Sequence, residues 1–245
     1  MTLTTEMREA MQIKNIKGEV LLTLDIDTLK GATLRGVDLT NANLRGVDLS
    51  DADLRGVNLA GAMLERAIFR NTYLESANLT ESNLSSADLT CVDLRGANLE
   101  GAFLKEANLE RADLTGANLR WTDLRETNLE RADLTGADLL YADLRDANLR
   151  DAKLREANLN NADLRDANIT TNIIRLDGMP CKVTIIEGYM RIGSQCHHVD
   201  TWGTFSDNDI TEMPDISLRD WLNNKQQIMA VAQSTKPEFR KAVHH

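Results

Sequence analysis

Residues 92–116 read VDLRGANLEGAFLKEANLERADLTG, and this stretch decides the fold. A large apolar residue returns at every fifth position, as at Leu94 and Leu99, and a small residue stands two places before each one. A period of five matches neither the 3.6 residues of a helical turn nor the alternation of a strand. The register holds without a gap over residues 32–171, as 28 consecutive units of the form A-[DN]-L-x-x. So long a strict period predicts a repeat architecture rather than an ordinary globular domain.

The repeated unit resembles the pentapeptide-repeat family, and the resemblance covers well over half of the chain. It implies an all-β solenoid, a right-handed quadrilateral parallel β-helix with four pentapeptides per coil and with the central Leu and the small residue pointing inward. Packing supports this, because only small side chains fit beside a Leu in so narrow a tube at native density. The repeat would make about seven coils, and stacked strands ~4.8 Å apart would give a rod on the order of 30 Å long.

The sequence on either side of the repeat breaks the five-residue register. Residues 11–26 contain a turn signal at Lys17-Gly18 and are predicted to form a hairpin or an added strand. A solenoid with a bare end would expose its core and its unpaired strand edges, so this segment is the expected N-terminal cap. The predicted organisation is a cap over residues 1–31, a β-helix over residues 32–174 and an α+β module over residues 175–245.

The segment after Ile174 predicts a small α+β module. Residues 182–192 are predicted to form a hairpin, Ser206 is a candidate N-cap of a short helix, and residues 218–229 carry apolar side chains at helical spacing. The string at residues 188–213 and the start of the chain resemble the corresponding parts of many phage and prophage pentapeptide-repeat proteins. That second resemblance implies a phage or prophage setting rather than a known activity.

Composition places the acidity of the chain in the repeat. The net charge is −10, and residues 32–171 carry 16 Lys/Arg against 24 Asp/Glu, which accounts for −8 of it. Such a surface disfavours direct binding to nucleic acid or to an anionic membrane. No segment approaches the ~20 apolar residues of a membrane span, and the first residues do not resemble a signal peptide. Three cysteines at irregular positions form no disulfide framework, so the expected compartment is the bacterial host cytoplasm.

Residues 20 apart are expected to stack, so the outward positions of the repeat should form ladders. Two acidic ladders are candidate partner-binding sites, and we expect them on one face and on the next: Asp93, Asp113 and Asp133, and Asp123, Asp143 and Asp163. Arginines stand two residues after the members of the second set and are expected to offset the repulsion between carboxylates ~4.8 Å apart. The ladders are either solvated, solubilising faces or a preformed anionic stripe for the basic groove of a partner protein.

Trp121 and Tyr141 are also 20 residues apart at an outward position, so we predict that they stack on each other. Exposed, stacked aromatic side chains on a rod with few aromatics suggest a contact site. They could contact a partner, pack against the protein's own tail, or have no binding role.

The sequence favours neither a catalytic site nor a metal site. All four histidines lie at or after residue 197, which leaves the repeat without a His-based acid or base. Cys181, Cys196, His197 and His198 offer soft ligands, but they lack the paired C-x2-C or H-x3-H spacing of structural zinc sites. Adjacent strand residues also point to opposite faces, which separates Cys196 from His197. We therefore expect no catalytic residue, no cofactor and no metal.

Two functions remain open. In the first, the rod is a DNA-mimic-like inhibitor of a host DNA-handling protein, because the quinolone-resistance members that the repeat resembles bind DNA gyrase as acidic, duplex-shaped rods. Restriction, CRISPR and repair enzymes are comparable targets. In the second, the chain is a scaffold whose C-terminal module recognises the partner while the rod acts as a spacer. A terminal region could also join copies into a homo-oligomer.

Overall fold

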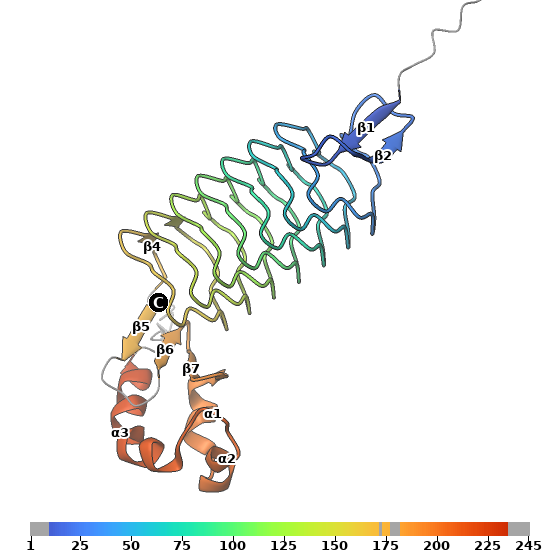
Figure 1. Cartoon of the computed structure of the whole chain (residues 1–245). Helices are drawn as coiled ribbons and strands as arrows, with labels where there is room; N and C mark the ends of the chain where they lie inside the picture. Colours follow the sequence, from blue (N-terminus) through green and yellow to red (C-terminus); the bar gives the residue numbers. More distant parts are fainter. Residues whose placement is uncertain (1–9, 172, 177–181, 235–245) are drawn as a thin grey trace, which may run out of the picture.

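The computed structural model describes residues 10–171, 173–176 and 182–234. A long rod of stacked coils carries a small hairpin at one end and an α+β module at the other (Figure 1). Parallel bridges join residues 20 apart, from Thr33 and Asp53 through Asp143 and Asp163, so each coil contains four pentapeptides. The predicted solenoid is confirmed. Most bridges involve one residue per strand, and the only two-residue pairing described within the rod joins β3 (Asn148–Leu149) to β4 (Asn168–Ile169).

The core of the rod consists of the two inward positions of each pentapeptide. The central residues from Leu34 to Leu159 are at most 3% exposed, and most of the small residues two places earlier are buried as well. Thr72 and Ser82 each occupy one of these small-residue positions. Their hydroxyls donate to backbone carbonyls at 2.7 and 2.8 Å. These two buried hydroxyls are thus satisfied, which keeps the cost of burying them low.

Backbone hydrogen bonds between coils hold the register. The amide of Asp93 donates to the preceding coil, and those of Leu94 and Gly96 donate to the following coil, at 2.7–3.0 Å. The amide of Arg95 donates instead to Oδ1 of Asp93, at 3.2 Å. The same contact recurs in unit after unit. The Asp or Asn side chain therefore accepts from an amide that has no backbone acceptor in a neighbouring coil. This local bond explains why the second position of the repeat is so often Asp or Asn.

The last position of each pentapeptide turns the corner with left-handed backbone. Gly occupies several corners, but nineteen non-glycine residues of the rod adopt φ between 55° and 62° there. This conformation costs a residue with a Cβ roughly 1–2 kcal/mol, so the bonds between coils must impose it. Large corner residues such as Trp121 and Tyr141 consequently project outward from a rigid backbone.

The predicted N-terminal hairpin is present as β1 (Met11–Lys14) and β2 (Val20–Leu24), paired antiparallel. Ile13 of β1 is 3% exposed and belongs to the core of the rod. The amide of Asn43 donates to the carbonyl of Lys14 at 2.8 Å, which ties the hairpin to the repeat. The hairpin therefore covers part of the open end of the rod.

The C-terminal module contains one antiparallel sheet and three helices. The strands run in the order β5 (Ile173–Leu176), β6 (Val183–Ile186), β7 (Tyr189–Ile192) and β8 (Gln195–His198), followed by α1 (Val199–Thr204), α2 (Asp207–Thr211) and α3 (Leu218–Ser234). The predicted hairpin is confirmed as β6 and β7, and Ser206 caps α2 through a capping box. Strands β5 and β8 and helix α1 have no counterpart among the elements that the sequence predicts. Within the described ranges, no helix is long and apolar enough to cross a bilayer.

Strand β6 of the module is buried on both faces. All four residues of β6 are buried, with Val183 and Ile185 in the module core beside Trp202 and with Ile186 in the rod core. The hydrophobic core of the rod and that of the module therefore meet at strand β6. The module closes the C-terminal end of the rod.

Arginine side chains of the module donate hydrogen bonds to backbone carbonyls at the end of the rod, where no further coil follows. Nη2 of Arg175 donates to the carbonyl of Leu159 at 3.0 Å, and Nη2 of Arg191 donates to the carbonyl of Glu156 at 2.7 Å. A solenoid end exposes a row of such unpaired groups, and each one buried without a partner would be costly. The junction between rod and module is thus closed by hydrogen bonds as well as by apolar contact.

Replacing Leu114 by Lys should prevent folding. Leu114 is fully buried in the rod, and an unpaired charge there would cost on the order of 5 kcal/mol, comparable with the whole stability of a domain. Circular dichroism should show loss of the β-rich spectrum and of a cooperative melt. The matched control is Thr115→Lys at the next, exposed position, which should melt like the parent. A Leu114→Lys variant as stable as the parent would refute the inward placement of the repeat leucines.

Candidate protein-binding surface

The two acidic ladders stack as expected but lie on opposite faces of the rod. Bridges join Asp93 to Asp113, and Asp123 to Asp143, in the predicted register. Asp113 and Asp123 are separated by ten residues, which is half of a twenty-residue coil. The expectation that the ladders occupy neighbouring faces is therefore wrong, and a flat partner surface could contact only one of them. This ten-residue offset was readable in the sequence.

Arginine side chains form ion pairs with the carboxylates of the second ladder. Nε and Nη2 of Arg125 donate to the two oxygens of Asp123 at 2.8 and 2.6 Å, and Nε lies 3.7 Å from Oδ2 of Asp143 in the next coil. The same two-point contact joins Asp143 to Arg145 and Asp163 to Arg165. This ladder is an internally paired network, because each guanidinium binds its own aspartate and most also approach the next.

The first ladder is paired in more varied ways. Asp93 holds Arg95 through two bonds of 2.8 and 2.6 Å, and Asp133 accepts from Nζ of Lys153 at 2.8 Å. Asp113 binds only Thr115 closely, and its side chain is 43% exposed. The other five aspartates of the two ladders have side chains only 19–31% exposed. Five of the six therefore make structural ion pairs and offer little free charge.

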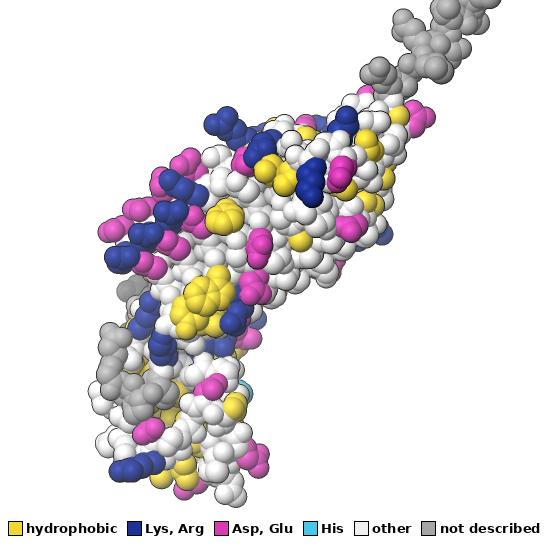
Figure 2. All heavy atoms as spheres, in the orientation of Figure 1, with side chains coloured by type: hydrophobic (Ala, Val, Ile, Leu, Met, Phe, Trp, Pro, Cys, Tyr) yellow, Lys and Arg dark blue, Asp and Glu magenta, His cyan; other side chains and the backbone are white. Residues whose placement is uncertain are grey.

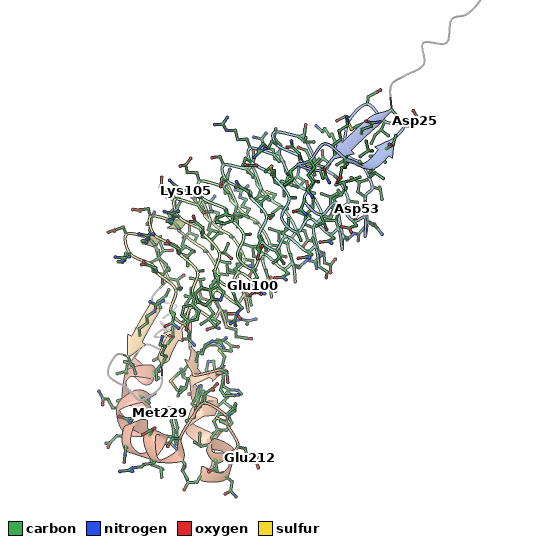
Figure 3. All side chains as sticks on the ribbon, in the orientation of Figure 1. Asp25, Asp53, Glu100, Lys105, Glu212 and Met229 are labelled. Carbon is green, nitrogen blue, oxygen red and sulfur yellow. The ribbon has the colours of Figure 1, made fainter. Side chains whose placement is uncertain are left out.

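A second set of carboxylates, at the corner beside the Asp123 ladder, is more exposed. We call it the outer acidic column: Glu106, Glu126, Asp146 and Asp166. Nζ of Lys105 lies 3.1 Å from Glu126 and 3.4 Å from Glu106, whereas Asp146 and Asp166 have no ion pair among the described residues. Figure 2 shows acidic and basic side chains alternating along this edge, and Figure 3 labels Lys105 on it. Its exposed corner position distinguishes this column from the partly buried ladders.

The predicted stack of Trp121 and Tyr141 is confirmed. The ring centroids are 4.1 Å apart and the planes differ by 10°. The two residues are 56% and 43% exposed, and they occupy the corner on the other side of the Asp123 ladder. Figure 2 shows a hydrophobic patch on this face of the rod. One face is thus bordered by aromatic rings at one corner and by exposed carboxylates at the other.

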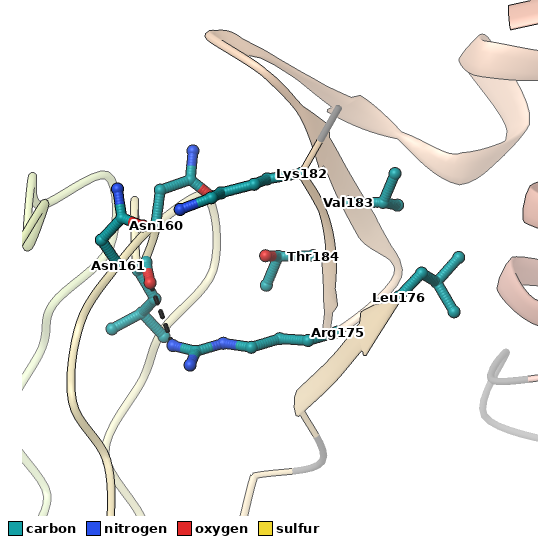
Figure 4. A pocket seen from close by; sticks show the side chains of 8 residues that line it. Asn160, Asn161, Arg175, Leu176, Lys182, Val183 and Thr184 are labelled. Carbon is teal, nitrogen blue, oxygen red and sulfur yellow. Dashed lines mark hydrogen bonds between the residues drawn. The ribbon is translucent and has the colours of Figure 1, made fainter. Parts of the chain in front are cut away.

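A small cavity lies where the rod meets the module (Figure 4). It has a volume of about 180 Å³ and polar walls. The residues that line it are Leu159, Asn160, Asn161, Arg175, Leu176, Lys182, Val183 and Thr184. Asn160 donates from Nδ2 to the carbonyl of Gly193 at 3.3 Å, so it joins Arg175 in holding the module to the last coil. These contacts are those of a joint between two parts of the fold.

The cysteine and histidine side chains considered as ligands have structural neighbours. Burial raises the pKa of the Cys196 thiol, which disfavours the nucleophilic thiolate. Nδ1 of His198 accepts from the amide of Asp200 at the start of α1, and His197 packs edge-on against Trp202. Cys181 lies outside the described residues. Within the described part of the chain, no three such side chains, acids included, converge on a metal position.

A family model for pentapeptide repeats matches the chain in 8 copies that together span residues 28–170. The chain belongs to the pentapeptide-repeat family. No match was found among curated proteins. This pentapeptide-repeat protein is also similar to solved structures.

One solved structure is HetL, a pentapeptide-repeat protein involved in heterocyst differentiation regulation from the cyanobacterium Nostoc sp. strain PCC 7120, at 32% identity over 56% of this chain and 87% of HetL, with a TM-score of 0.22. A second comes from the Arabidopsis thaliana thylakoid lumen, at 29% identity over 45% of this chain and 70% of its own, with a TM-score of 0.33. A trypsin-treated variant of QnrB1, a plasmid-mediated fluoroquinolone resistance protein, is 19% identical over 60% of this chain and 87% of its own, with a TM-score of 0.43.

Acidification should weaken the fold through the paired ladder. Hydrogen bonds from the adjacent arginines lower the pKa of Asp123 and Asp143, and Arg165 lowers that of Asp163 to about 2. The unfolded chain, with ordinary aspartate pKa values near 3.8, then binds more protons than the folded chain. This part of the stability is complete above about pH 5 and is lost as the pH falls toward 2.

The melting temperature, measured between pH 5 and pH 2.5, should therefore fall less steeply in an Asp123→Asn, Asp143→Asn, Asp163→Asn variant than in the parent. Asn keeps the oxygen that accepts the backbone amide, as Asn118 does for Arg120 at 3.1 Å. The control replaces Asp146 and Asp166, which have no ion pair among the described residues, and should keep the parent slope. Equal slopes in all three proteins would contradict the paired network.

Chelation should leave the protein unchanged. We expect elemental analysis of the purified protein to find no stoichiometric zinc, and the melting temperature to stay the same in excess chelator, because the cysteine and histidine spacing suits no structural zinc site. One zinc per chain, lost together with stability on chelation, would overturn this expectation.

Proposed function

We propose that this pentapeptide-repeat protein is a non-enzymatic acidic binding rod that occupies the basic groove of a host DNA-handling protein as a mimic of duplex DNA. The observation that carries the proposal is the outer acidic column. It sets four exposed carboxylates one coil apart, about 4.8 Å each, on a backbone whose hydrogen bonds repeat in every coil. One strand of duplex DNA carries about one charge per 3.4 Å of axis, which is a similar spacing.

Rigidity adds to this resemblance. The carboxylates of the column stand on left-handed corners such as Glu126 and Asp146, at φ 59° and 60°, which the hydrogen bonds between coils impose. Binding would therefore order little backbone, and the cost of association would be smaller than for a flexible acidic tail. A row of fixed charges also steers a basic partner during encounter, and added salt would screen that attraction.

The contact face would be the one between the outer acidic column and the aromatic corner. The Asp123, Asp143 and Asp163 ladder runs along its middle, where its arginines cancel much of its charge. The Asp93, Asp113 and Asp133 ladder would take part only if a partner encircles the rod, since it lies half a coil away. In this proposal, the column supplies attraction and the paired ladder supplies a stiff, polar floor.

The target class follows from this shape. We place it among host proteins with a basic DNA groove, of gyrase, restriction, CRISPR or repair type, in a phage or prophage setting as the terminal strings suggest. A right-handed quadrilateral rod of about seven coils, on the order of 30 Å long, would cover roughly one helical turn of duplex DNA. A cytoplasmic location and self-association through a terminal region also belong to this proposal.

The scaffold role remains as a second candidate because α3 exposes one large apolar side chain. Leu222 is 54% exposed on this helix of the module. Deleting residues 175–245 would not test the role cleanly, since Ile186 of the module closes the core of the rod. The point variant Leu222→Glu is the better test. Loss of partner binding by Leu222→Glu alone would favour the scaffold.

Neutralising the outer acidic column should weaken binding to a DNA-handling enzyme. The test variant combines Glu106→Gln, Glu126→Gln, Asp146→Asn and Asp166→Asn, and DNA gyrase is the first target. Affinity at low salt should fall about tenfold or more, the salt dependence should become shallower, and competition with a short DNA duplex should weaken in parallel. Association is measured by titration, with circular dichroism to show that the variant is folded.

The matched control is the set Asp93→Asn, Asp113→Asn and Asp133→Asn on the opposite face, which should bind nearly as the parent does. If both folded variants bind as tightly as the parent, the outer acidic column and the Asp93, Asp113 and Asp133 ladder are only solubilising. If a panel of gyrase, restriction, CRISPR and repair enzymes yields no competition with DNA at all, the mimic proposal is wrong.

A further inference from the structure

The corner column that contains the aromatic stack is interrupted by a gap. Its members are Asn41, Gly61, Glu81, Gly101, Trp121, Tyr141 and Asn161. Trp121 stacks on Tyr141 on one side, and on its other side the next position is Gly101, which has no side chain. Trp121 is more exposed than Tyr141 although it is larger, as expected if one face of the indole is uncovered. The uncovered face of the Trp121 ring is therefore directed along the rod, toward the position of Gly101.

Glu81 bounds the far side of this gap. A Cβ built at Gly101 would lie 3.6 Å from Cγ of Glu81, so the Glu81 side chain leans toward the gap. No ion pair or side-chain hydrogen bond of Glu81 is found in the part of the chain that the structure describes. Glu81 and Trp121 are two coils apart, about 9.6 Å. A flat group stacked on Trp121 at the 4.1 Å spacing of Tyr141 would come within reach of Glu81.

Two further residues of the Gly101 coil border the gap. Phe103 is 49% exposed on one side, and Glu100 precedes Gly101 on the other. Figure 2 shows acidic side chains next to the hydrophobic patch, and Figure 3 labels Glu100 on this face. The nearby cation Arg120 is held by Asp138, at 3.2 Å. The gap thus has aromatic and acidic borders, and no cation of the described chain is seen to occupy it.

We propose that this gap, the Gly101 slot bounded by Trp121, Glu81, Phe103 and Glu100, takes an arginine side chain of a partner protein. A guanidinium is flat, stacks on an indole face with a favourable cation–π interaction, and presents a fork of N–H donors that matches a carboxylate. Lysine carries the same charge but cannot fill a flat slot in this way. The choice of a protein partner rests on the proposed function, whereas the preference for arginine rests on the slot itself.

Acetylated and amidated tetra-arginine and tetra-lysine peptides are the probes. Trp202 and Trp221 are at most 2% exposed, so acrylamide quenching reports mainly on Trp121. Tetra-arginine should protect Trp121 from quenching and should bind about fivefold more tightly than tetra-lysine, within the range of an exposed to partly desolvated cation–π contact. Equal binding of the two peptides would overturn the proposal.

Filling the slot gives the decisive variant. Gly101→Tyr should fold, because Tyr141 has φ 62° in the same column and a Cβ at Gly101 makes only an ordinary contact. It should lose the arginine preference, with affinity for tetra-arginine lowered about fivefold. The control Gly56→Tyr has φ 65° at another corner with nothing within 4 Å, keeps the charge, and should bind as the parent does. Glu81→Gln should weaken tetra-arginine about threefold.

An arginine preference that survives in Gly101→Tyr would refute the slot. Neutralising the outer acidic column should lower the affinity of both peptides equally and leave the preference unchanged, since that column contributes only general attraction. Failure of the slot and failure of the DNA-mimic proposal are therefore separate results. The first is seen with peptides and Gly101→Tyr, and the second with the enzyme and the outer-column variant.

Discussion

Backbone hydrogen bonds between residues one coil apart are the interaction on which the rest of this structure depends. They can form in every coil only if each coil contains the same number of residues, which requires a gap-free period. The same bonds force the left-handed corners, at φ near 60°, even where the residue is Trp or Arg. The Asp or Asn of each unit then binds the amide that the coil does not use. The buried core, the left-handed corners and the Asp or Asn at the second position of each unit are thus consequences of one network of backbone hydrogen bonds.

The hydrogen bonds between coils also determine the spacing of charges on the surface. Outward side chains repeat at the strand spacing, so like charges come close together unless opposite charges are placed between them. At the Asp123, Asp143 and Asp163 positions arginines take this role, and the result is a paired, nearly neutral stripe. The carboxylates of the outer acidic column project from a corner instead, and two of them, Asp146 and Asp166, have no ion pair among the described residues. This division is why we assign binding to the outer acidic column and a supporting role to the paired ladder.

At each end of the rod, backbone N–H and C=O groups would lack a partner in a further coil. The two ends are closed differently. The N-terminal hairpin adds Ile13 to the core, whereas the C-terminal module brings a four-stranded sheet together with the side chains of Arg175 and Arg191. The module is therefore part of the rod's stability as well as a candidate contact surface. Truncation would confound these roles, so point variants such as Leu222→Glu separate them better.

The sequence by itself determined the solenoid, its core, the stacking of Trp121 on Tyr141 and several cap elements, because each follows from short-range spacing. It also contained the opposite placement of the two acidic ladders, through the ten-residue offset between Asp113 and Asp123. Only the tertiary structure decided which carboxylates are consumed by arginines, that β5 and β8 complete the sheet, and that Glu81 leans over Gly101. Those features depend on side-chain conformations and on contacts between distant segments, which a periodic pattern does not specify.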